Sequence, residues 1–244
     1  MFILFSPSEE KIKSSNNYNI EFIKNFFINF NTSQLSIKSN FRDNFLKEYA
    51  NNFNNLENIF GVKNTNDVFK NFSTNLYSAI NLYQGISFKE LSYNNLSDKS
   101  KDYINRHLII FSNLFGPIRP NDKIPFYKLK QGIKINNINQ AKSYKEDTSK
   151  QLDELINDFV IDLRAKIYEE YYDIKTNSVN FNFIKNGKQL SHSSKVYRAK
   201  ILKVLANNNV TELKELFNII NNDFNVLSIK TLDNKTIFNI DVKD

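Results

Sequence analysis

Apolar positions along the chain fall into short runs and helical spacings that alternate from one end to the other. Residues 2–5 form an apolar run that ends at a Ser-Pro pair, so they predict a buried strand. A second run, residues 108–111, follows a helical pattern over 98–106 and predicts a central strand. Apolar residues at helical spacing also predict helices over residues 20–30, 41–60 and 68–82.

The second half of the chain continues this alternation. Residues 152–160 predict a helix, and the apolar stretch 159–163 fits either the end of that helix or another strand. Apolar and polar residues alternate over 179–183, which is typical of a half-exposed strand, and Gly187 then turns the chain. A serine-capped helix is expected to follow, ending near residue 206.

The last predicted elements are a helix over residues 212–220 and a hairpin built from residues 226–231 and 236–241. No internal repeat or long linker interrupts this order. The sequence therefore predicts a single α/β domain over residues 1–244, with a mixed central sheet flanked by helices. The content of only 5 glycines and 4 prolines argues against a sandwich or barrel rich in tight turns.

Composition narrows the chemistry that is available. The chain has no cysteine and two histidines, His107 and His192, which excludes thiol chemistry and cysteine-ligated or histidine-rich metal sites. We therefore expect no metal and no cofactor. The apolar runs fall well short of the ~18 residues of a membrane span, and the first residues lack the basic region of a signal peptide. We expect a cytoplasmic monomer that does not contact membranes.

Positive charge is concentrated in two stretches of the chain. The formal net charge is +7, but residues 106–134 and 185–203 together carry +11 and the rest is net −4. Each of these two basic segments also contains one of the two histidines. The pattern favours an anion-binding surface, with two ordinary solvated faces as the alternative.

The first candidate segment, residues 6–11, directly follows the first predicted strand. Loops at the carboxyl ends of strands line the ligand crevice in open α/β sheets. Glu9 and Lys11 in this loop could serve as acid and base, or Lys11 could bind a phosphate. An ordinary polar loop is the alternative.

The second candidate segment, residues 113–129, contains three of the four prolines. Prolines fix the backbone, so the loop would hold Arg119 and Lys128 ready for an anionic ligand at low entropic cost. Lys123 lies between them and adds to the positive charge. The aromatic side chains of this loop fit either stacking on bases or packing in the core.

The third candidate segment is the start of a predicted helix. Ser191 and His192 precede that helix, which carries Lys195, Arg198 and Lys200. A helix start presents free N–H groups and the positive end of the helix dipole to an anion. The three-residue spacing from His192 to Lys195 to Arg198 places these side chains along one face. The segment predicts phosphate binding, with a solvated basic helix as the alternative.

The fourth candidate segment lies between two helical stretches and centres on Gly61, Val62 and Lys63. A helix, an apolar-Gly-apolar turn and a second helix outline a helix-hairpin-helix, whose backbone N–H groups grip DNA phosphate without reading sequence. A plain connecting turn is the alternative.

Five blocks of the sequence carry a resemblance to a known family. They are FSPSEEK at residues 5–11, Tyr83-Gln84-Gly85, HLIIFSNLFGPIRPNDKIPFYKLKQG at 107–132, Ile161-Asp162-Leu163-Arg164 with Tyr168, and Ser191-His192-x-x-Lys195. In this order and spacing they resemble the YaaA family, also called UPF0246 or DUF328, the bacterial peroxide stress resistance proteins. The chain departs from the family pattern at three places: Ala165 replaces Ser, Arg198-Ala199 replaces Lys-Gly, and Pro117 replaces an apolar residue.

The resemblance implies a compact α/β fold with a positively charged cleft and a helix-hairpin-helix associated with DNA binding. It also implies a role in limiting free iron and oxidative DNA damage under peroxide. On this basis the first hypothesis is a DNA-binding protein of the peroxide stress response that holds nucleic-acid backbone without sequence specificity. The alternative is an enzyme that acts on a nucleotide or another phosphorylated small molecule in the same cleft, with Glu9, Lys11 and His192 as catalytic candidates. Whether the protein is an enzyme stays open.

Both hypotheses require the basic residues of distant segments to meet. We expect one concave surface to collect Arg119, Lys128, His192, Lys195 and Arg198, because the excess charge is confined to their two segments. Glu9 and Lys11 are expected to border this surface, since strand-end loops gather at one edge of an α/β sheet.

Overall fold

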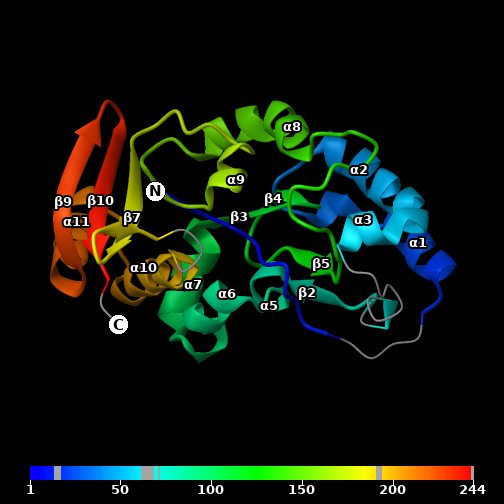
Figure 1. Cartoon of the computed structure of the whole chain (residues 1–244), viewed down its shortest axis with the longest axis horizontal. Helices are drawn as coiled ribbons and strands as arrows, with labels where there is room; N and C mark the ends of the chain where they lie inside the picture. The colour runs from blue at the N-terminus through cyan, green and yellow to red at the C-terminus, as the bar shows by residue number, and fades with distance from the viewer. Residues whose placement is uncertain (14–17, 62–68, 71, 191–193, 243–244) are drawn as a thin grey trace.

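A mixed sheet runs through the computed structural model, which describes residues 1–13, 18–61, 69–70, 72–190 and 194–242 (Figure 1). The strands of this eight-stranded sheet are β1 (Phe2–Phe5), β3 (Leu108–Ser112), β4 (Gly116–Ile118), β6 (Val160–Leu163), β7 (Ser178–Lys185), β8 (Lys188–Gln189), β9 (Asn225–Leu232) and β10 (Lys235–Asp241). Their order is β4-β3-β1-β6-β7-β10-β9, with β8 beside β7. A separate ribbon pairs β2 (Leu76–Ser78) with β5 (Lys123–Pro125).

The five central strands are parallel. β1 pairs with β3 on one side and with β6 on the other, and β7 pairs in parallel with both β6 and β10. Ile3 therefore lies between Leu108 and Ile161 in the register. The chain first leaves β1 towards β3 and later returns to the other side of β1 to form β6. The topological switch point, where open α/β sheets bind their ligands, thus falls between β1 and β6.

Helices cover the sheet and extend beyond its β4 end. In Figure 1, α6 (Ile86–Leu91), α7 (Asp98–His107) and α10 (Ser194–Asn208) lie on one side of the central strands and α8 (Gln140–Leu155) lies on the other. Helix α10 packs against α6, α7 and α11 (Leu213–Asp223). Past β4, α1 (Ile20–Ile28) packs on α2 (Asn40–Asn51), followed by α3 (Leu56–Phe60). The short helices α5 (Ala79–Leu82) and α9 (Lys166–Glu169) lie in connections.

Aromatic side chains fill much of the interior. Around Phe53, the rings of Phe27, Tyr49, Phe60 and Phe72 pack at centroid distances of 5.0–6.2 Å, mostly edge to face. Aromatic pairs in this geometry contribute about 0.5–1.5 kcal/mol each beyond the area they bury. The phenylalanine content of the sequence is thus used chiefly as core.

The predicted mixed α/β architecture is confirmed, and several elements lie where the sequence places them. The strand over residues 2–5, the central strand beginning at Leu108 and the terminal hairpin are all present. The alternative strand at 159–163 is the one that forms, as β6. No helix in the described ranges is both long and apolar enough to cross a membrane.

Three helix predictions are wrong in part. The helix predicted over 152–160 is the end of α8, which begins at Gln140 and stops at Leu155. The stretch 41–60 is interrupted, because a 3-10 turn over Asn52–Asn55 separates α2 from α3. Within the described part of 68–82, residues 79–82 form the short helix α5, and residues 76–78 form β2 instead. The strand forms because it pairs with β5. This partner lies almost fifty residues further along the chain, and local periodicity gives no information about such a distant pairing.

Candidate functional site

Loops from four distant segments meet at the carboxyl edge of the parallel strands. The loop after β1 contacts the start of α6, where a Cβ placed on Gly85 would lie only 2.0 Å from Ser8 Oγ. The start of α6 in turn contacts α10, since Ser87 Oγ donates a hydrogen bond to the carbonyl of Lys195 at 3.0 Å. The loop after β6 joins this group through Ser6. Glu9 and Lys11 therefore lie at the same sheet edge as the start of the basic helix α10.

Lys11 is buried at this edge, with 5% of its surface exposed. Its Nζ donates to the backbone carbonyls of Ser8 and Glu9 at 3.0 and 3.3 Å and lies 3.9 Å from the ring centroid of Tyr127. The pKa of Lys11 is lowered from 10.5 to about 7, chiefly by burial and also by nearby Lys128, while Glu9 opposes the shift. An amine with a pKa near neutrality can accept and release a proton under physiological conditions.

Hydroxyl groups form a buried network next to Lys11. The hydroxyl of Tyr127 donates to Asn113 Oδ1 at 3.2 Å, so it accepts from Tyr83 at 3.0 Å and from Ser112 at 2.9 Å. Burial raises the pKa of Tyr83 to about 12 and the pKa of Tyr127 well above its ordinary value. Both phenols therefore remain protonated and hold the aromatic wall against Lys11 in a fixed orientation.

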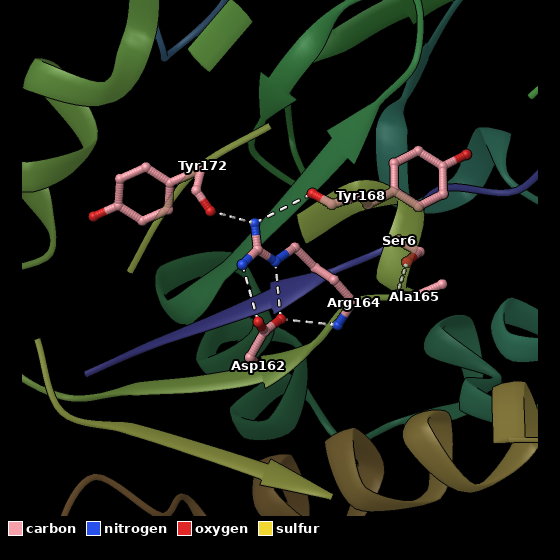
Figure 2. A network of polar contacts seen from close by, with 6 residues as sticks. All are labelled: Ser6, Asp162, Arg164, Ala165, Tyr168 and Tyr172. Atoms are coloured by element: carbon pink, nitrogen blue, oxygen red, sulfur yellow. Dashed lines mark hydrogen bonds and ion pairs between the residues drawn. The ribbon is translucent and has the colours of Figure 1, made fainter. Parts of the chain in front are cut away.

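A buried ion pair follows β6 (Figure 2). Arg164 Nε and Nη2 donate to the two carboxylate oxygens of Asp162 at 2.9 Å each, and Nη1 donates to the carbonyls of Tyr168 and Tyr172. The exposed fractions of Asp162 and Arg164 are only 8% and 4%. Beside this pair, the backbone N–H of Ala165 donates to Ser6 Oγ at 2.7 Å. These contacts fasten the β6 loop to the β1 loop directly at the switch point.

A cavity of about 210 Å³ opens between the β6 loop, β7 and α10. Arg198 lines it and is half-buried, while Lys166 and Glu169 contribute from α9. Burial lowers the pKa of Arg198 below its ordinary value, and the carboxylates of Asp162 and Glu169 oppose that shift. The site thus presents a partly desolvated guanidinium beside a fixed polar wall, an arrangement suited to a small anion.

The structure places Arg119 elsewhere, so the prediction that it shares a surface with Lys195 is wrong. Arg119 Nη2 donates to the carbonyls of Asn105 and Arg106, and its guanidinium carbon lies 5.1 Å from the ring centroid of Phe2. Phe2 begins β1, so Arg119 lies at the amino edge of the sheet, opposite to Lys11. The side chain satisfies the free carbonyls at the end of α7, a common role for arginine at helix C-termini.

The remaining predicted residues divide into those the structure places and those it does not describe. Lys128 lies beside Lys11, Lys195 and Arg198 are near the start of α10, Lys123 begins β5, and Lys200 is exposed on α10 with its Nζ 5.4 Å from the ring centroid of Tyr197. Four lie outside the described residues: Val62, Lys63, Ser191 and His192. Within the described ranges, no group of His, Asp or Glu side chains is placed to hold a metal ion.

Gly61 ends α3 in the left-handed region, at φ +67°, and its N–H donates to the carbonyl of Glu57 at 2.8 Å. This conformation favours glycine, as the predicted turn requires. A Cβ at this position would also meet the Lys130 side chain at 2.6 Å. The hairpin residues after Gly61 and the start of the second helical stretch, predicted over 68–82, lie within residues 62–68, outside the described part of the chain. The helix-hairpin-helix and the wide basic cleft therefore stay predictions.

Sequence reasoning did not assign a role to the hydroxyl network or to the Asp162–Arg164 pair. Tyr83, Tyr127, Asp162 and Arg164 all lie within the five sequence blocks that carry the family resemblance. Their appearance in those blocks is the one available signal. It marks the positions without showing that the side chains pack around Lys11 and the switch point.

Close approach of the Ser8 side chain makes Gly85 a sensitive position. We expect Gly85→Ala to lower the free energy of unfolding by about 1–3 kcal/mol, because the new methyl group would overlap Ser8 Oγ. Urea denaturation measures this loss. The double variant Gly85→Ala/Ser8→Ala removes the overlapping oxygen and should recover most of it. An unchanged stability in the single variant would show that the β1 loop moves away freely.

Comparisons with known proteins agree along most of the chain. Residues 1–228 match the family described as peroxide stress protein YaaA. The chain is 40% identical over 226 residues to an uncharacterised protein of Campylobacter jejuni, covering 88% of this chain and 89% of that protein. It is 29% identical over 239 residues to a UPF0246 protein of Fusobacterium nucleatum, covering 93% of each. A UPF0246 protein of Malacoplasma penetrans is 32% identical over 173 residues, or 66% of this chain and 70% of that protein.

Proposed function

Because the chain belongs to the YaaA family of peroxide stress proteins, we propose that it binds nucleic-acid phosphate at the carboxyl edge of its sheet. Through this binding it would help limit iron-driven oxidative damage to DNA. The observation that carries the proposal is a group of four cations at that edge. None of them forms an ion pair with another described residue: Lys128, Lys166, Lys195 and Arg198.

Unpaired cations gathered at one edge create a positive potential that a phosphate backbone can neutralise. Two other exposed lysines do form ion pairs: Lys89 with Glu10 at 2.8 Å and Lys175 with Asp153 at 2.6 Å. Lysine and arginine contacts to phosphate fix the position of a nucleic acid without reading its bases. The expected binding is therefore salt-dependent and largely independent of sequence.

The test is a fluorescence-anisotropy titration of a labelled duplex at 50 and 200 mM salt. Lys166→Ala and Lys195→Ala should each weaken binding and lower the slope of log K against log salt by about one unit per lost contact. Lys175→Ala is the control, because Lys175 is an exposed lysine just before the amino end of β7, on the opposite edge of the sheet. Equal effects of all three variants, or binding unaffected by salt, would contradict the proposal.

A second candidate function is an enzyme acting on a nucleotide or another phosphorylated small molecule. The buried Lys11, with its pKa near 7, favours this candidate, because plain backbone binding does not need an amine poised to exchange protons. Mass spectrometry of small molecules released from the purified protein tests for such a ligand. A ligand lost in Lys11→Met, with duplex binding retained, would support the enzyme.

A further inference from the structure

The cavity between the β6 loop, β7 and α10 contains a polar group that lacks a partner. Asn180 lines this cavity, and its Oδ1 is buried without a hydrogen-bond partner among the described residues. A buried acceptor without a partner costs about 1–3 kcal/mol. Asparagine is also a poor strand former. Neither packing nor strand propensity therefore accounts for this residue in β7.

The neighbouring asparagine on the same face of β7 behaves differently. Asn182 Nδ2 donates to Asn239 Oδ1 at 3.0 Å, and Asn182 Oδ1 accepts from Gln189 Nε2 at 3.0 Å. The alternate residues Phe181 and Phe183 are buried, and the Phe183 ring stacks on Tyr197 of α10. Asn182 is thus a structural amide that links strands. Asn180 also lines the cavity, but its Oδ1 has no hydrogen-bond partner among the described residues.

Charge in the cavity favours an anion near this amide. The carboxylate of Asp162 is engaged at both oxygens by Arg164, which leaves Glu169 as the acidic group against Arg198, Lys166 and Lys235. Lys166 is exposed and Lys235 is half-buried, as is the side chain of Arg198. The planar fork of donors of Arg198 matches a phosphate better than a lysine ammonium does.

Size restricts what can enter. A volume of about 210 Å³ holds roughly seven waters at about 30 Å³ each. It lies below the ~300 Å³ at which pockets for drug-sized ligands begin, and a duplex cannot enter it. A single ring with a donor–acceptor edge fits, with a charged group at the mouth. Asparagine recognises such an edge in nucleobases, where its amide donates and accepts at once.

We propose that this cavity receives one nucleotide, its base hydrogen-bonded to the Asn180 amide and its phosphate bound by Arg198. The proposal deepens the proposed function, since it rests on nucleic-acid phosphate binding at this edge and adds a site for an individual base. The nucleotide comes either free or as a unit turned out of a strand. In both cases Asn180 supplies base contacts and Arg198 supplies the anion contact.

Isothermal titration with AMP, GMP, CMP, UMP and inorganic phosphate tests the proposal. At least one mononucleotide should bind the parent protein, and Asn180→Leu should weaken it about tenfold while leaving inorganic phosphate unchanged. Arg198→Met should weaken both probes, and Lys214→Met, at an exposed lysine of α11, should weaken neither. Melting curves establish that each variant is folded, and Asn180→Leu should not lower stability because the buried amide oxygen it removes has no partner among the described residues.

A single-stranded oligonucleotide separates the two sources of the nucleotide. An oligonucleotide whose affinity falls in Asn180→Leu indicates a unit turned out of a strand, whereas an effect on the mononucleotide alone indicates a free nucleotide. If Asn180→Leu weakens neither, or if no mononucleotide or oligonucleotide binds, the proposal is overturned. Salt-dependent duplex binding that is sensitive to Lys195→Ala would, in that event, leave the proposed function standing.

Discussion

Arg164→Met should lower the free energy of unfolding by about 3–5 kcal/mol, because it leaves the Asp162 carboxylate charged and unpaired in the interior. The guanidinium also bonds to the carbonyls of Tyr168 and Tyr172, and these acceptors would lose their donors. The damage should reach the site, since the same loop is tied to Ser6 through Ala165 (Figure 2).

Urea denaturation of three variants measures this effect. Arg106→Met removes an exposed pair, Arg106–Asp102 at 2.6 Å, and should change stability by no more than about 0.5 kcal/mol. The double variant Arg164→Met/Asp162→Leu removes both buried charges and should regain part of the loss. If the single buried variant were as mild as the exposed one, Asp162 would have to be reached by water or protonated in the native state.

Lys11→Met should give a pH-dependent difference in stability from the parent protein. The folded state holds Lys11 at a pKa of about 7 and the unfolded state at about 10.5, so between these values the unfolded chain binds more protons. The stability of the parent relative to the variant therefore rises with pH, by about 1.4 kcal/mol per unit between pH 7 and 10. Below pH 7 the amine is charged in both states, and the full unfavourable burial is present.

Urea midpoints of the two proteins at pH 6, 7.5, 8.5 and 9.5 measure this dependence. Comparing the parent with the variant cancels the titration of tyrosines and other groups that the two share. Lys89→Met, an exposed lysine paired with Glu10, is the control and should give a nearly flat difference over the same range. A flat difference for Lys11→Met as well would mean that the Lys11 ammonium is well solvated.

The pattern of apolar residues predicted correctly those elements whose structure is decided by their own residues. Residues 108–111 are apolar throughout and fully buried between β1 and β4, so composition alone indicates a central strand. The stretch 159–163 is too short for periodicity to distinguish helix from strand. Its strand pairing with β1 and β7 settles the matter through partners that lie far away in the sequence.

The sequence predicted at which edge of the sheet the candidate site lies, but it did not predict which side chains surround the buried Lys11. The rule that strand-end loops gather together placed Glu9 and Lys11 correctly beside the start of α10. The burial of Lys11 depends on aromatic rings at positions 83 and 127, and no local pattern connects them. Arg119 was misplaced because charge counting cannot distinguish a side chain that meets a ligand from one that bonds to its own backbone.

The central position of β1 has a consequence for the timing of folding. Ile3 is synthesised first but pairs with Leu108 and Ile161, so its second partner emerges 158 residues later. At about 5–20 residues per second on the ribosome, the first strand waits roughly 8–30 s before its second partner strand has emerged. The switch point closes only when the β6 loop arrives. Assembly of this sheet is therefore expected to depend on chaperones or on slow elongation more than on any local nucleus.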